Sequence, residues 1–246
     1  MKQGTYRIAD TVFGIFSIYG QVHDMCRDYR CEEPAELTVT VDPSDIDRER
    51  IMAEKQNRLE GGCGRSYADA YLETLVVYRK IAHLLLDQDV LLFHGSAISV
   101  DGEAYLFTAP SGTGKSTHPR LWRQMFGDRA FMVNDDKPLL KITDSGVIVY
   151  GSPWDGKHRL SRNTAVPLKA ICILERSGDN HIEPITTAQA LPVLLQQTHR
   201  PRNRNDLIQT VDLMDRLVHR IRLFRLGCNM APEAAGVSYN GMQTPW

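Results

Sequence analysis

One segment of this 246-residue chain places glycines, a lysine and a hydroxyl side chain in the order that suits phosphate binding. It reads Ala109-Pro110-Ser111-Gly112-Thr113-Gly114-Lys115-Ser116, which fits the pattern of Gly or Ala, any four residues, Gly-Lys, and Ser or Thr. Its glycines let successive backbone N–H groups approach phosphate oxygens. Lys115 would place its charge on the β- and γ-phosphates, and the Ser116 hydroxyl would ligate Mg²⁺. The predicted nucleotide-binding residues are Pro110, Ser111, Gly112, Thr113, Gly114, Lys115, Ser116 and Thr117.

The flanking sequence supports this prediction. An apolar strand-forming segment, 103–108, precedes the loop, and helix-forming residues from about Lys115 to Phe126 follow it. The positive end of that helix dipole would add to phosphate binding. An incidental glycine-rich turn is the alternative, and the strand and helix weigh against it. No Asn-Lys-x-Asp motif of the kind that reads guanine follows the loop, so we expect ATP as the nucleotide.

Two adjacent carboxylates form the next chemical feature. Asp135 and Asp136 follow the apolar segment 131–133, at the end of a strand that would face the ligand crevice of an α/β sheet. One carboxylate would hold Mg²⁺ and the other would accept a proton from an attacking hydroxyl. The alternative is a turn, because Asn-Asp-Asp-Lys-Pro is rich in turn formers.

A histidine precedes both features in the chain. His94 ends a predicted strand, and Gly95 after it indicates a tight backbone at a strand end, where active-site groups collect. From the sequence, His94 is equally well interpreted as a supporting catalytic residue and as a structural one.

These segments resemble the HPr kinase/phosphorylase family, which shares its phosphate-binding core with the ATP-dependent phosphoenolpyruvate carboxykinases. Three blocks in the family's order carry the resemblance: Phe93–Ala97, Tyr105–Ser116 and Val133–Asp136. The similarity extends over roughly residues 90–165. It implies an ATP- and Mg²⁺-dependent kinase.

The resemblance also implies roles for individual residues. Asp135 would be the catalytic proton acceptor, Asp136 a metal or structural carboxylate, and His94 a supporting residue. Lys115 would act on the phosphates, and Ser116 with Asp136 would hold the metal. In the segment 151–162, the cations Lys157, Arg159 and Arg162 would reach the γ-phosphate, with Arg159 counted among the catalytic residues.

The chain departs from HPr kinase at two points. Thr117 stands where HPr kinase has a glutamate after the loop serine, and the later signature for phosphorylase action and HPr docking is not recognisable. The chain is more similar to shorter HPr-kinase-like proteins of bacterial genomes. The expected acceptor is therefore a hydroxyl on a protein, a peptide or a small molecule.

Two other functions compete with the kinase. A non-catalytic ATP-binding regulator would bind the nucleotide without transferring its phosphoryl group. Carboxykinase chemistry is disfavoured because the chain is about half the length expected for that fold. The basic run His199–Arg204 is either a solvated loop or an acceptor-docking site.

Hydrophobic periodicity predicts an α/β fold. Residues 1–88 would form an N-terminal α+β lobe with strands at 6–9, 12–19 and 36–41 and helices at 45–59 and 67–86, separated by a Gly-rich break at 61–64. Residues 89–246 would form the nucleotide-binding catalytic domain, for which the resemblance implies a mixed-sheet core of the HPr kinase and phosphoenolpyruvate carboxykinase type. Its strands are expected at 90–93, 97–100, 103–108, 130–133, 139–142, 146–150, 170–174, 181–184 and 222–226, and its later helices at 187–196, 205–220 and after Pro232.

Composition narrows the functional class further. The net charge of −1 argues against a nucleic-acid or anionic-membrane partner, and no apolar run reaches the length of a membrane span. Five scattered cysteines and the lack of a secretory signal favour reduced thiols in the cytoplasm over disulfides or a zinc site. A homo-oligomer is compatible with the resemblance, because HPr kinases are hexamers.

Overall fold

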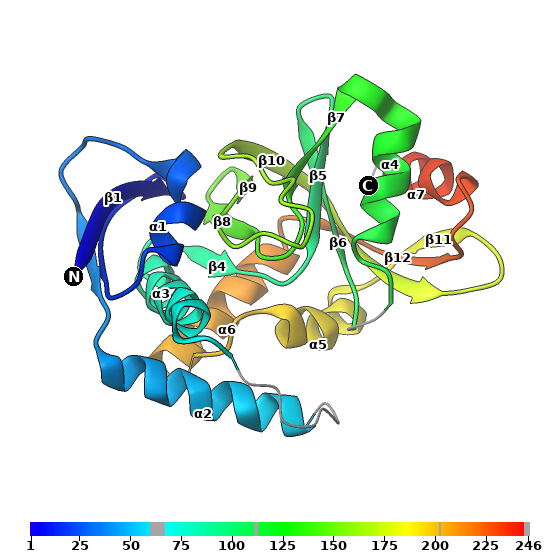
Figure 1. Cartoon of the computed structure of the whole chain (residues 1–246). Helices are drawn as coiled ribbons and strands as arrows, with labels where there is room; N and C mark the ends of the chain where they lie inside the picture. The colour runs from blue at the N-terminus through cyan, green and yellow to red at the C-terminus, as the bar shows by residue number, and fades with distance from the viewer. Residues whose placement is uncertain (60–66, 111–112, 202, 244–246) are drawn as a thin grey trace. The chain divides into compact units, whose positions relative to one another are not determined.

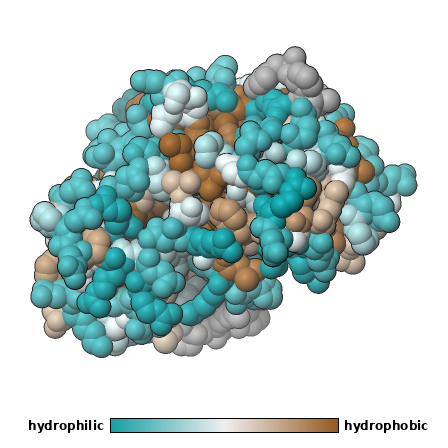
Figure 2. Space-filling model, turned by 90° about the horizontal axis from the view of Figure 1, so that it is seen from above, coloured by the Kyte–Doolittle hydropathy of each residue, from teal (hydrophilic) through white to brown (hydrophobic). Residues whose placement is uncertain are grey.

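The computed structural model describes residues 1–59, 67–110, 113–201 and 203–243. The chain forms two compact units, Met1–Leu84 and Leu85–Trp246. Among the described residues, no helix has both the length and the apolar composition needed to span a membrane. Figure 2 shows one face on which hydrophilic residues predominate and hydrophobic residues form smaller patches.

The first unit combines a small sheet with helices. Strands β1 (Lys2–Ile8) and β2 (Thr11–Ser17) form an antiparallel hairpin, and β3 (Leu37–Thr40) pairs parallel to β2. Helices α1 (Gln21–Met25), α2 (Pro43–Leu59) and α3 (Asp69–Leu86) complete it, with a short 3-10 turn at Arg27–Tyr29. Buried Glu73 accepts the backbone N–H groups of Ile18 and Tyr19 at 2.5 and 2.9 Å. That carboxylate fixes α3 to the segment after β2, because a buried charge requires hydrogen-bond partners.

The second unit is built on a mixed sheet. Its strands are β4 (Val90–Leu92), β5 (Ser96–Val100), β6 (Glu103–Thr108), β7 (Ala130–Asn134), β8 (Leu139–Thr143), β9 (Gly146–Tyr150), β10 (Ala165–Arg176), β11 (His181–Pro184) and β12 (Arg222–Cys228). They run in the order β4-β8-β9-β10-β6-β5-β7, with β12 between β10 and β11. Strand β10 pairs antiparallel with β9 through its first residues and parallel with β6 and β12 through the rest. This long strand therefore joins the two parts of the sheet.

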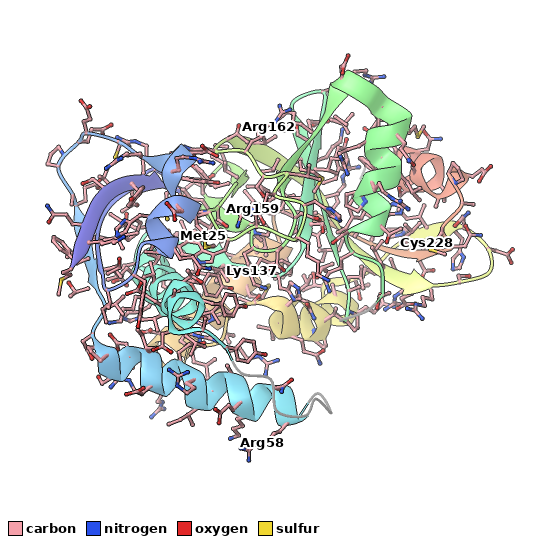
Figure 3. The ribbon with its side chains drawn as sticks, in the orientation of Figure 1. Met25, Arg58, Lys137, Arg159, Arg162 and Cys228 are labelled. Carbon is pink, nitrogen blue, oxygen red and sulfur yellow. The ribbon has the colours of Figure 1, made fainter. Side chains whose placement is uncertain are left out.

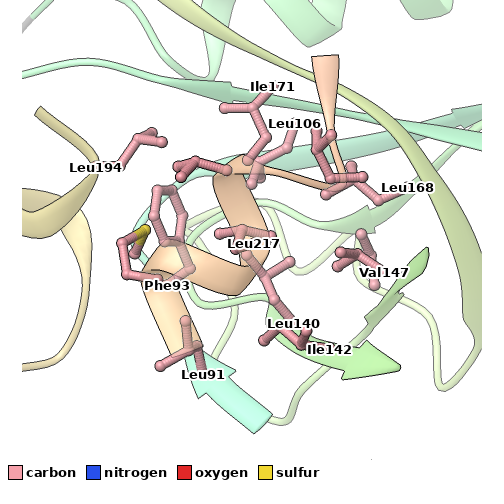
Figure 4. Close-up of a cluster of buried hydrophobic side chains, with 14 of the residues drawn as sticks. Leu91, Phe93, Leu106, Leu140, Ile142, Val147, Leu168, Ile171, Leu194 and Leu217 are labelled. Atoms are coloured by element: carbon pink, nitrogen blue, oxygen red, sulfur yellow. The ribbon is translucent and has the colours of Figure 1, made fainter. Parts of the chain in front are cut away.

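Helices cover both faces of that sheet (Figure 1). Helices α5 (Thr187–Gln197) and α6 (Arg204–Val218) pack on one face, and α4 (Thr117–Phe126) and α7 (Glu233–Gln243) on the other. Alternate residues of β6 point to opposite faces, as strand geometry requires: Leu106 joins the core under α5 and α6, and Phe107 joins the core under α4. Figure 4 shows the first of these cores, with Leu194 and Leu217 reaching from the helices toward Leu106. A strand buried on both faces is a rigid base for the loop that follows it.

The mixed α/β class and the order of helices and strands predicted from the sequence are confirmed. Several details differ, including the start of β1, which lies at Lys2, four residues before the expected start. Helix α4 begins at Thr117, two residues later than expected, and β10 begins at Ala165 because its start pairs with β9. The short helix α1 was not predicted, because five residues carry too little periodicity. The predicted break at 61–64 lies outside the described residues.

Candidate functional site

The glycine-rich loop connects the buried end of β6 to α4. Gly114 has a φ of +108°, which only glycine adopts without strain, and its carbonyl accepts the N–H groups of Thr117 and His118 at 2.9 and 3.2 Å. Ser116 is the N-terminal cap residue of α4. Ser111 and Gly112, which the sequence assigns to phosphate binding, lie outside the described residues. The described part of the loop thus has the sharp turn that brings backbone close to a ligand.

The Lys115 side chain folds back across the base of this loop. Its Nζ donates to the carbonyl of Ala109 at 2.9 Å. Burial and the charge of Lys137 lower the pKa of Lys115, and the opposite charge of Asp136 partly offsets them. An anionic ligand would oppose both unfavourable contributions, because a nearby negative charge stabilises the charged ammonium group.

The carboxylates of Asp135 and Asp136 have opposite environments. Asp135 is 8% exposed, and its Oδ1 accepts the Ser96 hydroxyl at 2.7 Å. Burial raises the pKa of Asp135, the charge of Asp155 adds to this rise, and hydrogen bonds from Ser96 and Ser116 oppose it. The Ser116 hydroxyl therefore faces Asp135 in this structure.

Asp136 is held between a histidine and a lysine. Its Oδ1 lies 3.3 Å from His94 Nε2 and 3.3 Å from Lys137 Nζ. Burial alone would raise the pKa of Asp136, but the His94 hydrogen bond and the Lys137 charge outweigh it and lower the pKa. Asp136 is therefore the carboxylate that stays ionised, and Asp135 is the one that takes up a proton more readily.

Backbone geometry fixes the position of His94. Its N–H donates to the carbonyl of Gln197 at 2.7 Å, and the next N–H, of Gly95, donates to the carbonyl of Asp136 at 3.2 Å. A Cβ at position 95 would lie 2.9 Å from the carbonyl oxygen of Phe107, so the tight backbone predicted at Gly95 is confirmed. The second contact places His94 directly beside the acidic pair.

The buried side chain of Asn134 organises the turn at the end of β7. Its Oδ1 accepts the N–H groups of Asp136 and Lys137 at 2.9 and 2.6 Å. Its Nδ2 donates to the carbonyls of Ser152 and Trp154 at 3.2 and 3.4 Å. One amide group thereby orients the acidic pair and attaches the segment after β9 to it.

That segment supplies the remaining wall of the site. The Asp155 carboxylate accepts the N–H groups of Gly156 and Ser161 at 2.6 and 3.0 Å, which closes a turn. A Cβ at Gly156 would lie 3.2 Å from Oδ2 of Asp135, so glycine permits this turn to pack against the carboxylate. Trp154 is 6% exposed and anchors the segment.

Together these elements enclose a cavity of about 650 Å³, which we call the charged cavity. It is lined by His94, Gly114, Lys115, Ser116, Thr117, Asp135, Asp136, Asp155, Gly156, Lys157 and His158. The structure therefore brings together most of the site residues expected from the sequence. It adds Asp155 and His158, which were missed, although the Asp-Gly turn at 155–156 is a recognisable loop signal.

Four expected residues in the described part of the chain do not line the charged cavity. One is Thr113, whose hydroxyl donates to the carbonyl of Pro110 at 2.9 Å. Arg159 is exposed, has a φ of +47° and does not line the charged cavity. The Arg162 guanidinium stacks on the Phe131 ring, 4.5 Å from its centroid. Pro110 is exposed and outside the cavity wall. Figure 3 shows Arg159 and Arg162 as separate side chains of this segment.

The described part of the basic run at 199–204 lies beside His94. Phe93 and Thr198 form an antiparallel bridge, and the N–H of His199 donates to the carbonyl of Leu92 at 2.9 Å. Arg202 lies outside the described residues, and Arg200 is exposed. The pairing brings this segment close to one edge of the charged cavity.

The described residues contain no group of three or more His, Cys, Asp or Glu side chains arranged to hold a metal ion. The donors at the charged cavity are carboxylate and hydroxyl oxygens, the ligand type that Mg²⁺ prefers. Mg²⁺ is commonly held by one or two carboxylates together with substrate phosphates. The oxygen donors present fit that mode of binding.

Comparison with known proteins places the chain in context. A family model described as "SynChlorMet cassette protein ScmC" matches residues 70–234. No curated protein sequence matches the chain. Among solved structures, the Hpr(Ser) kinase/phosphatase from Coxiella burnetii is 13% identical, with 61% of this chain and 94% of that chain covered at a TM-score of 0.34. A similarity of that size is too weak to support an inference about function.

Proposed function

This chain belongs to the ScmC family, and we propose that it is a Mg²⁺-dependent kinase that transfers the γ-phosphoryl group of ATP to a hydroxyl group. The observation that carries the proposal is the charged cavity. It gathers a lysine and a hydroxyl from the glycine-rich loop with two carboxylates of opposite protonation tendency. The family is distinct from the HPr kinase/phosphorylase family that the motifs resemble.

In this proposal, each part of the transfer falls to a side chain of the charged cavity. Gly114 and Lys115 hold the phosphates, and the lysine charge offsets the negative charge of the transferring group. The acceptor oxygen attacks the γ-phosphorus, the bond from the γ-phosphorus to the β,γ-bridging oxygen breaks, and ADP leaves. Asp135 takes the acceptor's proton, because burial raises its pKa and Ser96 orients its carboxylate.

The metal would be held by Ser116 and Asp136. Mg²⁺ supplies positive charge to the β- and γ-phosphate oxygens. Asp136 suits this role because His94 and Lys137 keep it ionised. The Ser116 hydroxyl hydrogen-bonds Asp135, which supports a competing assignment in which Asp135 holds the metal and Asp136 takes the proton.

Label transfer from γ-³²P-ATP with Mg²⁺ tests the proposal. The acceptors are a cell extract separated into protein, peptide and small-molecule fractions, and the variants are Asp135→Asn and Asp136→Asn, with exposed Asp128→Asn as the matched control. We expect label in one fraction, a fall of several orders of magnitude for Asp135→Asn, and no change for Asp128→Asn. Asp136→Asn should raise the Mg²⁺ concentration needed for half-maximal rate.

The other outcomes are informative. If Asp135→Asn, and not Asp136→Asn, raises the Mg²⁺ concentration needed for half-maximal rate, then Asp135 holds the metal and Asp136 takes the proton. ATP binding with no labelled acceptor in any fraction would contradict the kinase and favour a nucleotide-dependent regulator.

A further inference from the structure

A second cavity opens on the other side of the glycine-rich loop. It has a volume of about 540 Å³ and shares Gly114 and Thr117 with the charged cavity. Its walls come from the start of α4 and from the carboxyl ends of β10 and β12, including Leu121, Leu174 and Met230. We call it the apolar cavity. Any ligand that passes Gly114 and Thr117 would occupy both cavities.

The lining of the apolar cavity is mostly uncharged, whereas the lining of the charged cavity is ionic. Leu121 and Leu174 are 5% and 1% exposed, whereas Met230 is 77% exposed, a large apolar side chain left in solvent. Contact with a flat apolar group would be favourable, because it would remove the exposed apolar surface of Met230 from water. Among the charged side chains that the structure describes, only exposed Arg176 lines this cavity.

His118 adds an independent observation. It lines the apolar cavity, is 2% exposed, and uses its Nε2 to bond the Ser238 hydroxyl at 2.9 Å. Its Nδ1 is buried and has no hydrogen-bond partner in the structure. Burial lowers the pKa of His118 to about 4, so the ring is neutral at neutral pH. It therefore presents no charge to an apolar ligand in the cavity.

The mouth of the apolar cavity is preformed. The Asn229 side chain donates to the carbonyl of Gly178 at 2.9 Å and accepts from the Asn180 amide at 3.1 Å. These bonds tie the turn after β10 to the turn after β12. A site that exists before its ligand arrives binds without a large ordering cost.

We propose that the apolar cavity holds the purine nucleoside of the nucleotide whose phosphates occupy the charged cavity. The inference rests on the proposed function for the identity of that nucleotide. The base would lie against Leu121, Leu174 and Met230, and the chain of phosphates would cross the loop at Gly114 and Thr117. The mostly uncharged wall of the apolar cavity suits a purine ring, and the ionic wall of the charged cavity suits the triphosphate.

Cys228 provides a direct test, because it lines the apolar cavity and is partly exposed (Figure 3). The full-length protein would be alkylated with N-ethylmaleimide. Peptide mass spectrometry would measure the extent of modification at each cysteine over time. Burial raises the pKa of the Cys228 thiol, so the reaction is run at mildly alkaline pH. Cys31, in the other unit and also partly exposed, is the internal reference.

We expect saturating ATP to slow alkylation of Cys228 about tenfold, while inorganic tripolyphosphate, which offers only phosphates, leaves it unchanged. Neither ligand should affect Cys31. Equal protection by tripolyphosphate, or no protection by ATP at a concentration that saturates binding, would overturn the proposal.

A filled cavity gives the second test. Ser177→Trp, at the cavity wall, should weaken ATP binding roughly 50-fold, the order expected for losing burial of one aromatic ring, and leave tripolyphosphate binding unchanged. Asp179→Trp, exposed two residues away and outside the lining, is the matched control. Unchanged ATP affinity in Ser177→Trp would refute the nucleoside site. Unchanged tripolyphosphate affinity in Lys115→Ala would instead refute the phosphate site, so the two failures are distinguishable.

Discussion

The two cavities beside α4 share two residues and little else. In the charged cavity, hydrogen bonds fix the side chains: Ser96 orients Asp135, and His94 holds Asp136. In the region under the apolar cavity, aromatic packing contributes more: the Trp122 ring is fully buried against neighbouring aromatic rings, and Trp122 and His118 both hydrogen-bond the Ser238 hydroxyl. Lys137 and Arg159 lie on the side of β8 and β9, and Cys228 beside β11 and β12 (Figure 3). Loss of one partner disrupts the geometry of a whole polar network, whereas a packed core loses stability gradually as its side chains are substituted.

The largest effect should follow from breaking the network at its centre. Asn134→Ala removes the acceptor for the Asp136 and Lys137 N–H groups and the donor to Ser152. We expect the rate of phosphoryl transfer to fall about 100-fold and the free energy of unfolding to fall by about 2–3 kcal/mol, because buried partners lose their hydrogen bonds. Label transfer and urea unfolding measure the two quantities.

Asn205→Ala, at an exposed position of α6, is the control and should leave both unchanged. Protection of Cys228 by ATP should persist in Asn134→Ala, because the apolar cavity does not depend on this amide. Near-normal transfer in Asn134→Ala would contradict the view that hydrogen bonds set the geometry of the charged cavity.

In the region under the apolar cavity, we expect His118 to make the stability of the protein depend on pH. His118 has a pKa of about 4 in the native protein and about 6.5 when unfolded. Between these values the unfolded state binds a proton that the native state does not, so stability falls as pH decreases through the window and the loss is complete below it. The predicted loss for His118 is about 3 kcal/mol between about pH 7 and about pH 4.

His118→Gln should remove that part of the pH dependence while keeping a polar group near Ser238. Urea unfolding of both proteins across the same pH range measures the difference, in which contributions from other residues cancel. An equal slope in the two proteins would show that His118 is protonated in the native state as readily as in the unfolded one.

The two histidines show how much of the site the sequence could predict. His94 and His118 each stand beside a recognisable motif, and nothing local distinguishes their environments. The loop and the acidic pair were found because their residues are adjacent in the chain. The partners of Asp135 and Asp136, namely Ser96, Asn134 and His94, are contributed by different strand ends and depend on the order of the sheet.

The same reason explains which features of the site the sequence did not locate. Arg159 carries the charge expected of a phosphate-binding residue, but it follows the turn closed by Asp155 and does not line the charged cavity. The apolar cavity left no sequence signal, because Leu174 and Met230 come from segments more than fifty residues apart. Strand order and turn closure are tertiary properties that periodicity does not encode.

A smaller effect is expected from crowding Asp135. Gly156→Ala places a methyl group 3.2 Å from Asp135 Oδ2, tighter than an ordinary contact, so the carboxylate must shift by a fraction of an ångström. We expect the transfer rate to fall about tenfold with ATP affinity unchanged, because positioning of the base suffers and the phosphate loop does not. Gly178→Ala, where the added carbon meets nothing within 4 Å, is the control. Weaker ATP binding in Gly156→Ala would show that this turn contacts the nucleotide instead.

The smallest effect concerns the acid side of the pH–rate profile. His94→Gln removes the hydrogen bond that contributes most to lowering the pKa of Asp136, so burial is less opposed and that pKa rises. Asp136 then loses its charge at a higher pH as the solution is acidified, and the acid limb of the profile moves to higher pH. At alkaline pH, where Asp136 is ionised in both proteins, the rates should converge. Equal loss of rate at every pH would show that His94 acts on the reacting groups themselves, whereas convergence identifies it as the residue that keeps the metal-binding carboxylate charged.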